Sequence, residues 1–175
     1  FPLFAYGIAV GAAMTRRPQQ YIARVAALAL VSQPLYAVAL GHTNEAMYAV
    51  PFAQHPLRAL CAFYMESWEK PSILLALLLG LLLLLCLREK RYVPALLIYV
   101  LCVRFSADLD YGVSGIGLMV IFYLFLEHPA LCFAASTAYM LVWSADGHGY
   151  PIFGMEFGMR IFATPAVMLA SLPIH

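Results

Sequence analysis

The feature that most constrains this chain is a leucine-rich run from Pro71 to Leu87 that contains no charged residue. A helix that crosses the hydrocarbon core of a bilayer needs about 17–25 predominantly apolar residues, and this run reaches the lower end of that range. The run stops abruptly at the charged residues 88–91. The pattern therefore predicts a transmembrane helix that ends in a charged turn.

Composition extends this interpretation to the whole chain. Of its 175 residues, 64% are hydrophobic and only 11% are charged, whereas a soluble domain has roughly 45–50% apolar and about 25% charged residues. So few polar residues would not cover a water-exposed surface, which excludes a soluble enzyme, a disordered chain and a disulfide-stapled module. A net charge of +1 gives no electrostatic reason to expect nucleic acid as a partner. We therefore expect an integral membrane protein.

Six other apolar segments resemble membrane helices, although several are short for a full crossing. The first begins inside an apolar stretch, so we expect the native chain to start upstream, with another helix before it. The expected fold class is all-α: a polytopic transmembrane helical bundle of about seven spans, the first truncated, forming a single integral membrane domain over residues 1–175. The additional spans are Phe1–Met14, Tyr21–Leu40, Tyr92–Phe105, Gly112–Leu126, Pro129–Trp143 and roughly Gly158–Leu172.

Charged residues predict the orientation and one large loop. Residues 41–70 are repeatedly interrupted by polar side chains, which predicts an outer loop with short amphipathic helices at the membrane interface. Most of the basic residues flank two turns on one side of the membrane, and the positive-inside rule makes that side cytoplasmic. These basic residues are Arg16, Arg17, Arg24, Arg88, Lys90 and Arg91.

Ionisable residues near the outer ends of two spans are candidates for a site, because such groups are costly in lipid and usually face a cavity or a partner. Arg104 lies near the end of its span, and Asp108 follows four residues later, on the same face if the helix continues. Asp110 and Tyr111 precede the next span, where free amides and the helix dipole favour a carboxylate. An ion pair and a helix N-cap explain the same spacing without a catalytic role.

Gln33 is a polar side chain inside an apolar span, next to Pro34. Proline interrupts the backbone hydrogen bonds of a helix, so we expect Gln33 to hydrogen-bond a neighbouring helix or to line a cavity. The four cysteines lack the spacing of a metal site or a disulfide framework. The residues alone therefore indicate a polytopic helical membrane protein without a metal site.

Several short motifs, taken together, resemble the TraX family. They recur in the family's order over most of the chain, and each motif is short and mostly apolar. The motifs are FPLFA at residues 1–5, the segments 21–24 and 32–36 of the following span, Ser-Ile-Leu at 72–74, Asp-Tyr-Gly-Val-Ser-Gly at 110–115 and Phe-Tyr-Leu-Phe at 122–125.

This resemblance implies an inner-membrane protein, related to transmembrane acyltransferases, that transfers an acetyl group from acetyl-CoA to the N-terminal amine of a conjugative or fimbrial pilin. Its partners would be the pilin subunit, acetyl-CoA and the lipid bilayer. Such a site needs a base for the amine, donors for the oxyanion and cations for the coenzyme's phosphates. The candidate catalytic residues are Asp110, Tyr111, Arg104 and Gln33, and the candidate cofactor-binding residues are Arg16, Arg17, Arg88 and Arg91.

The chain departs from the family pattern at both ends, and other functions stay open. Family members carry an Asp-His pair in the helix before FPLFA, and usually a Tyr-Pro-x-His stretch near the C-terminus, where residues 162–168 of this chain contain no histidine. The fragment is therefore either inactive or uses other groups. Membrane topology alone also explains the arginines. The alternative functions are a non-enzymatic membrane scaffold or assembly factor for pilus subunits and, less favoured because no paired halves indicate an inverted repeat, a small-molecule transporter.

Overall fold

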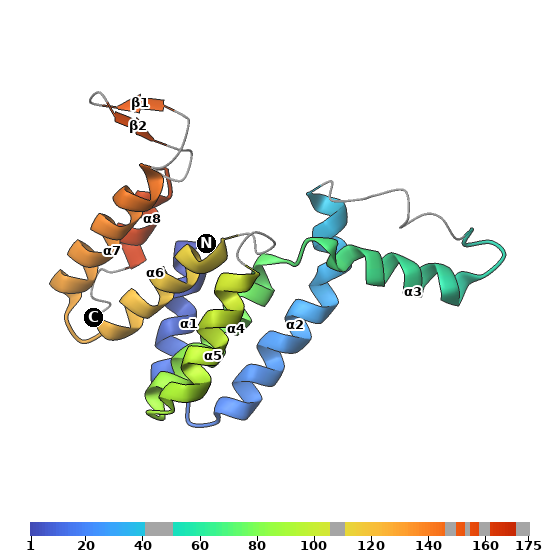
Figure 1. The fold of residues 1–175 in the computed structure, drawn as a ribbon, viewed down its shortest axis with the longest axis horizontal. Helices are drawn as coiled ribbons and strands as arrows, with labels where there is room; N and C mark the ends of the chain where they lie inside the picture. The colour runs from blue at the N-terminus through green and yellow to red at the C-terminus, as the bar shows by residue number, and fades with distance from the viewer. Residues whose placement is uncertain (41–50, 106–110, 146–149, 153–154, 158–161, 171–175) are drawn as a thin grey trace.

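The computed structural model describes residues 1–40, 51–105, 111–145, 150–152, 155–157 and 162–170, which are mostly helical (Figure 1). The helices pack as a bundle, with one helix extending away from it. The described elements are α1 (Pro2–Met14), α2 (Pro18–Ala39), α3 (Pro56–Glu66), the 3₁₀ turn η2 (Ser67–Glu69), α4 (Ile73–Arg88), α5 (Tyr92–Arg104), α6 (Gly112–Leu124), α7 (Pro129–Ser144), β1 (Tyr150–Ile152), β2 (Met155–Phe157) and α8 (Thr164–Ala170).

Proline begins several of these helices. Helices α1, α2, α3 and α7 each have a proline at the start of the first turn, where its missing N–H is not needed and its fixed φ angle suits the helix. This explains why α2 begins at Pro18, before the predicted start at Tyr21. The other predicted boundaries up to residue 144 lie within a few residues of the observed ones.

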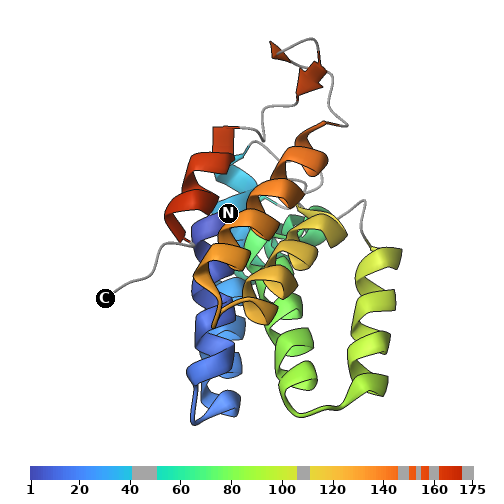
Figure 2. The same ribbon diagram turned by 90° about the vertical axis from the view of Figure 1, so that its left-hand side faces the viewer.

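Helix α1 packs closely against three other helices. Its small side chains Ala5, Ala9 and Ala12 are completely buried, and the helix packs against α4, α6 and α8 (Figure 2). Residues spaced three and four apart share one helix face, and small residues on such a face let neighbouring backbones approach closely. The large buried side chains around α1 come mainly from α4 and α6, for example Leu81 and Phe122.

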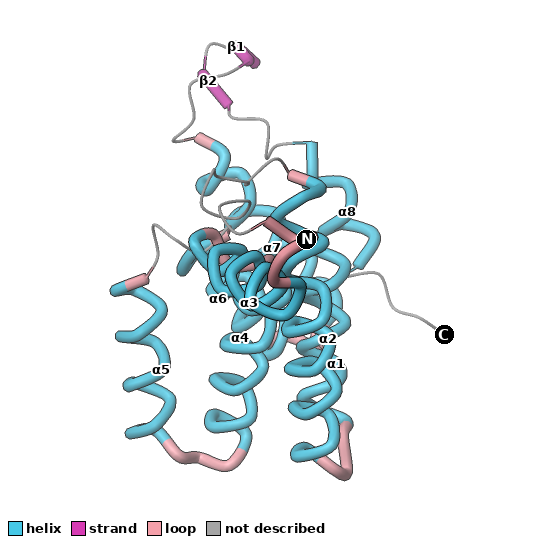
Figure 3. The backbone as a smooth tube through the Cα atoms, turned by 90° about the vertical axis from the view of Figure 1, so that its right-hand side faces the viewer, coloured by secondary structure: helices cyan, strands magenta, loops and turns pink. Residues whose placement is uncertain are grey.

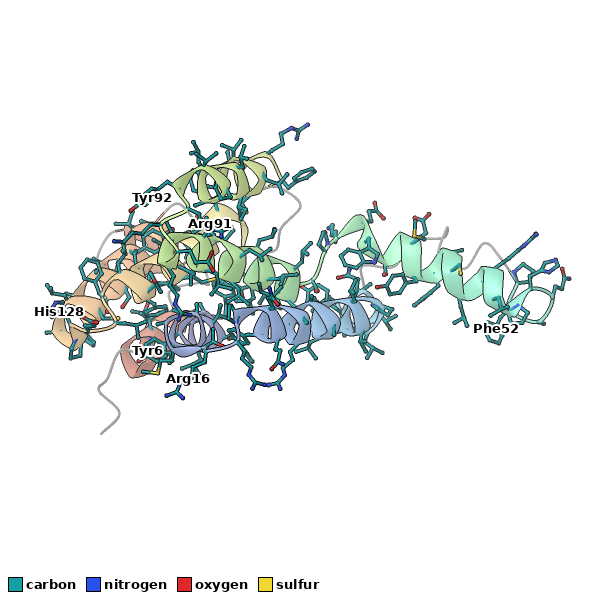
Figure 4. All side chains as sticks on the ribbon, turned by 90° about the horizontal axis from the view of Figure 1, so that it is seen from below. Tyr6, Arg16, Phe52, Arg91, Tyr92 and His128 are labelled. Carbon is teal, nitrogen blue, oxygen red and sulfur yellow. The ribbon has the colours of Figure 1, made fainter. Side chains whose placement is uncertain are left out.

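Helix α3 extends away from the bundle, and Figure 4 shows Phe52, which precedes it, far from the other labelled residues. Its apolar side chains Leu57, Leu60 and Met65 are exposed, at 78%, 55% and 71%. Of the short helices expected within residues 41–70, the structure describes an α-helix at 56–66, whereas its place at the outer membrane interface stays a prediction. Residues 41–50 lie outside the described residues.

The number of complete membrane spans is lower than expected from the sequence. Within the described residues, only α2 is both long and apolar enough for a complete crossing, and α3–η2 with α4 form a second candidate that is bent by 64°. Helices α5 and α6 have 13 residues each and are about 20 Å long at 1.5 Å per residue, against about 30 Å of hydrocarbon. The structure therefore supports one or two spans by length and does not establish seven.

The C-terminal part differs most from the expected all-α fold. Antiparallel strands β1 and β2 pair Tyr150 with Phe157 and Ile152 with Met155. Of the predicted span Gly158–Leu172, the structure describes an α-helix only in α8, which has seven residues. The all-α class is confirmed for the described helices, and this short hairpin beyond α7 is an exception that the sequence did not predict.

Glycine at position 115 permits the close approach of α1 and α6, which predicts a specific loss of stability on substitution. A Cβ atom at Gly115 would lie 2.7 Å from Cβ of Tyr111 and 2.8 Å from the ring of Phe1. We expect Gly115→Ala to lower the free energy of unfolding by about 1–3 kcal/mol, the usual cost of overpacking. SDS-induced unfolding in mixed micelles, followed by circular dichroism, measures this change.

Gly7→Ala is the matched control for this substitution. A Cβ atom at Gly7 would meet nothing within 4 Å, and alanine has the higher helix propensity. We expect this variant to be as stable as the unsubstituted protein or slightly more so. Equal stability of the two alanine variants would contradict the proposed role of Gly115.

Candidate functional site

Aromatic side chains from three helices meet at the start of α6. The rings of Phe1 and Tyr111 stack, with centroids 4.2 Å apart and planes 12° from parallel. Trp143 of α7 contacts Tyr111 edge-on at 6.1 Å, and Tyr139 lies 6.2 Å from Trp143. We call these four residues the aromatic cluster. It brings together the first residue of the FPLFA motif and the tyrosine of the Asp-Tyr-Gly motif, which are far apart in the sequence.

The first turn of α6 fixes the position of Tyr111. Tyr111 is the N-cap residue, and its carbonyl accepts a hydrogen bond from the N–H of Gly115 at 2.9 Å. Gly112 has a φ angle of 50°, a left-handed conformation that glycine adopts without the steric cost of a side chain. The hydroxyl of Tyr139 donates to the carbonyl of Ser114 at 2.9 Å, which ties α7 to the same turn.

The structure places the predicted catalytic residues in different surroundings. Tyr111 belongs to the aromatic cluster, whereas Arg104 is exposed at the end of α5, with its guanidinium 5.9 Å from the centroid of the Phe105 ring. Asp108 and Asp110 lie outside the described residues, so the expected pair of Arg104 with Asp108 stays a prediction. Asp110 directly precedes Tyr111 in the sequence.

Gln33 forms a polar joint between helices. Its side chain is completely buried, and its amide nitrogen donates to the carbonyls of Ser67 at 2.5 Å and Lys70 at 3.1 Å. Its amide oxygen accepts from the N–H of Ser72 at 2.8 Å. The expected hydrogen bond to a neighbouring segment is confirmed. These bonds use both amide protons, so Gln33 holds the bend between η2 and α4.

Two arginines predicted for the same role have different partners. Arg88 donates from one nitrogen to the carbonyls of Ala12 at 3.0 Å and Thr15 at 2.8 Å. These carbonyls lie at the C-terminal end of α1, where a cation is favoured by the free acceptors and the helix dipole. Arg91 instead pairs with Glu89 at 2.9 Å, and its side chain is 70% exposed. The contacts of Arg88 confirm that the two basic turns lie at the same end of the bundle.

A cavity of about 360 Å³ opens between α1 and α2, at the end of the bundle where the two basic turns lie. We call it the basic pocket because Arg17 and Arg24 line it. All three nearby arginines are exposed, but Arg16 points away from the bundle (Figure 4). Tyr21 lies directly against Gly11, where a Cβ atom would be 2.5 Å from the tyrosine hydroxyl. The sequence predicts Arg24 only as one of the basic residues on the cytoplasmic side, whereas the structure places it in the wall of this pocket. The other lining residues are Val10, Met14, Thr15 and Gln20.

The fold and these two regions define an apolar helical bundle with one or two candidate membrane spans, a cationic pocket at one end and an aromatic cluster at the other. A family model described as TraX protein matches residues 1–146. The chain therefore belongs to the TraX family, and the predicted resemblance is confirmed. This membership supports a pilin-related role in conjugation. No curated protein and no solved structure matches the chain.

Removing the amide of Gln33 tests the polar joint. Gln33→Leu keeps a side chain of similar size but leaves the carbonyls of Ser67 and Lys70 and the N–H of Ser72 without this partner. An unsatisfied buried polar group costs about 1–3 kcal/mol, so we expect a loss of stability of at least that size in SDS unfolding. Gln19→Leu, at an exposed position of the same helix, is the control and should leave the stability unchanged. Similar effects of the two variants would contradict the joint.

Arg88 and Arg91 are expected to differ in how much each contributes to stability. Arg88→Met removes both hydrogen bonds to the end of α1, and because bonds from charged groups contribute about 1.5–3 kcal/mol, we expect a loss in that range. Arg91→Met removes only an exposed ion pair, so we expect a loss of about 0–1 kcal/mol. Thermal unfolding of the two variants in detergent measures the difference, and a larger loss for Arg91→Met would overturn the assignment.

Proposed function

We propose that this chain is part of a membrane-embedded acetyltransferase of the TraX family, which transfers an acetyl group from acetyl-CoA to the N-terminal amine of a pilin subunit. The observation that carries the proposal is the pairing, at opposite ends of α1, of the basic pocket with the aromatic cluster around Tyr111. Family membership is the reason to propose pilin as the acceptor, and the basic pocket is the reason to propose an anionic acetyl donor. The site of action is the bacterial inner membrane, crossed several times.

The basic pocket suits the phosphates of acetyl-CoA. Arg17 and Arg24 both line it, and guanidinium groups bind phosphate oxygens through paired, charge-assisted hydrogen bonds. The pocket also lies at the N-terminal end of α2, where free backbone N–H groups favour an anion. Val10 and Met14 give the pocket an apolar side, which suits the uncharged part of the donor.

We assign the transfer of the acetyl group to the end of α1 that lies at the aromatic cluster. The Asp110 carboxylate accepts a proton from the pilin amine, whose nitrogen then attacks the thioester carbonyl. The Tyr111 hydroxyl donates a hydrogen bond to the oxyanion that forms. The carbon–sulfur bond then breaks, the acetyl group stays on the amine as an amide, and coenzyme A leaves as the thiolate, which takes up a proton.

A second candidate function is a non-enzymatic scaffold for pilus subunits. The observation that favours it is the exposed apolar side of α3, which extends from the bundle with Leu57, Leu60 and Met65 uncovered. A scaffold would retain pilin during purification without transferring an acetyl group. Transfer of label from acetyl-CoA to pilin therefore distinguishes the two functions.

We expect Arg17→Gln and Arg24→Gln each to raise the KM for acetyl-CoA. A charge-assisted hydrogen bond contributes about 1.5–3 kcal/mol, which corresponds to roughly a tenfold to hundredfold increase. The measurement is transfer of labelled acetyl from acetyl-CoA to pilin, in vesicles that contain the full-length native protein. Arg16→Gln is the matched control, because it removes the same charge from a side chain that points away from the pocket.

The same assay tests the proposed role of Asp110 as the base. Asp110→Asn should lower the rate of transfer at saturating acetyl-CoA, with little change in KM, because the carboxylate acts on the amine. Unchanged transfer in this variant would remove Asp110 from the mechanism. Equal KM values for the Arg17, Arg24 and Arg16 variants would remove the basic pocket as the donor site.

A further inference from the structure

A second cavity, of about 520 Å³, lies between α4, α5 and α6. We call it the apolar groove, because its walls carry aliphatic and aromatic side chains and no charged residue. Leu87 and Tyr92 lie at the end where α4 turns into α5 (Figure 3), and Leu96 and Tyr99 continue along α5. Cavities of roughly 300–1,000 Å³ are the usual size of ligand sites.

Gly117 and Tyr139 shape the wall opposite α5. A Cβ atom at Gly117 would lie 3.1 Å from the Tyr139 ring, so glycine allows this ring from α7 to lie against α6. The Tyr139 hydroxyl donates to the carbonyl of Ser114, and its polar atom is thereby satisfied within the protein. The ring consequently contributes apolar surface to the groove, which suits a hydrocarbon chain and not a polar ligand.

Two basic side chains flank one end of the groove. Leu87 and Tyr92, which line it, bracket a turn that contains Lys90 and Arg91, both exposed. Lys90 has a φ angle of 57°, and the N–H of Arg91 donates to the carbonyl of Cys86 at 2.8 Å. This is the hydrogen bond of a Schellman cap, with Lys90 in the left-handed position. The cap holds both cationic residues where the apolar groove ends.

An apolar groove that ends at cations is complementary to an amphiphile with a hydrocarbon chain and an anionic headgroup. Glu89 neutralises part of the charge of Arg91, and Arg88 is occupied by the carbonyls of α1, so Lys90 is the principal cation of the turn. By the positive-inside rule this turn faces the cytoplasm, where anionic lipid headgroups attract basic residues.

We propose that the apolar groove binds one acyl chain of an anionic phospholipid, with its phosphate at Lys90 and Arg91. This lipid site is separate from the basic pocket between α1 and α2 and does not depend on acetyl transfer. It gives the 13-residue helix α5 an apolar neighbour on the side that faces the groove. The bound lipid therefore connects α5 to α6 and α7.

Native mass spectrometry of the detergent-purified protein tests the proposal. The protein is titrated with phosphatidylglycerol and, separately, with phosphatidylcholine that carries the same acyl chains. We expect one phosphatidylglycerol to be retained, and at least about tenfold weaker retention of phosphatidylcholine. Lys90→Gly removes the cation and keeps a residue suited to the left-handed conformation, so it should abolish this preference without unfolding the turn.

The groove itself is tested with two neighbouring tryptophan substitutions. Leu96 lines the groove and Leu97 does not, although the two side chains are 62% and 65% exposed. Leu96→Trp should fill part of the groove and lower phosphatidylglycerol retention at least about fivefold, whereas Leu97→Trp should leave it unchanged. Thermal unfolding of both variants shows whether the fold is kept.

Three results would overturn the lipid site. The first is that the unsubstituted protein retains the two phospholipids equally. The second is that Lys90→Gly keeps the preference for phosphatidylglycerol. The third is that the Leu96 and Leu97 variants lose binding to the same extent. The first two measurements do not depend on the folding of a tryptophan variant. Free glycerol phosphate, added as a competitor, should displace the lipid poorly because it has no chain to occupy the groove.

Discussion

The close packing of α1 is the constraint on which the rest of the structure depends. Three alanines contribute to its buried face, so α4 and α6 approach its backbone there more closely than larger side chains would permit. The same helix is held at both ends. Phe1 stacks on Tyr111 at one end, and Arg88 donates to the carbonyls of Ala12 and Thr15 at the other. The positions of both candidate regions therefore depend on one helix.

The apolar runs predicted most helices because length and hydrophobicity are local properties of the sequence. The boundaries of α4 to α7 follow the apolar runs to within a few residues. The hairpin of β1 and β2 was missed because three-residue strands carry too short an alternating pattern to be recognised. The bend between η2 and α4 was missed for a different reason. It is held by the amide of Gln33, whose partners lie more than thirty residues away in the sequence.

The same distinction between local and distant interactions applies to the candidate site. The motif around Tyr111 is visible in the sequence, whereas its stacking on Phe1 depends on the packing of α1 against α6. Charge alone predicted one common role for Arg17, Arg88 and Arg91. The structure separates them because their hydrogen-bond partners differ: one arginine lines a pocket, one binds carbonyls at a helix end, and one forms an exposed ion pair.

The shortness of α5 and α6 bears on how the bundle fits a bilayer. Each helix has 13 residues and is about 20 Å long, which is less than the roughly 30 Å of a bilayer's hydrocarbon core. A short apolar helix is accommodated by local thinning of the bilayer, by flanking side chains that reach the interface or by oligomerisation, each at a cost of a fraction of a kcal/mol per ångström. Thinning beside α5 and α6 would bring a donor bound at the cytoplasmic surface closer to an acceptor at the opposite surface, which is the geometry that the proposed transfer requires.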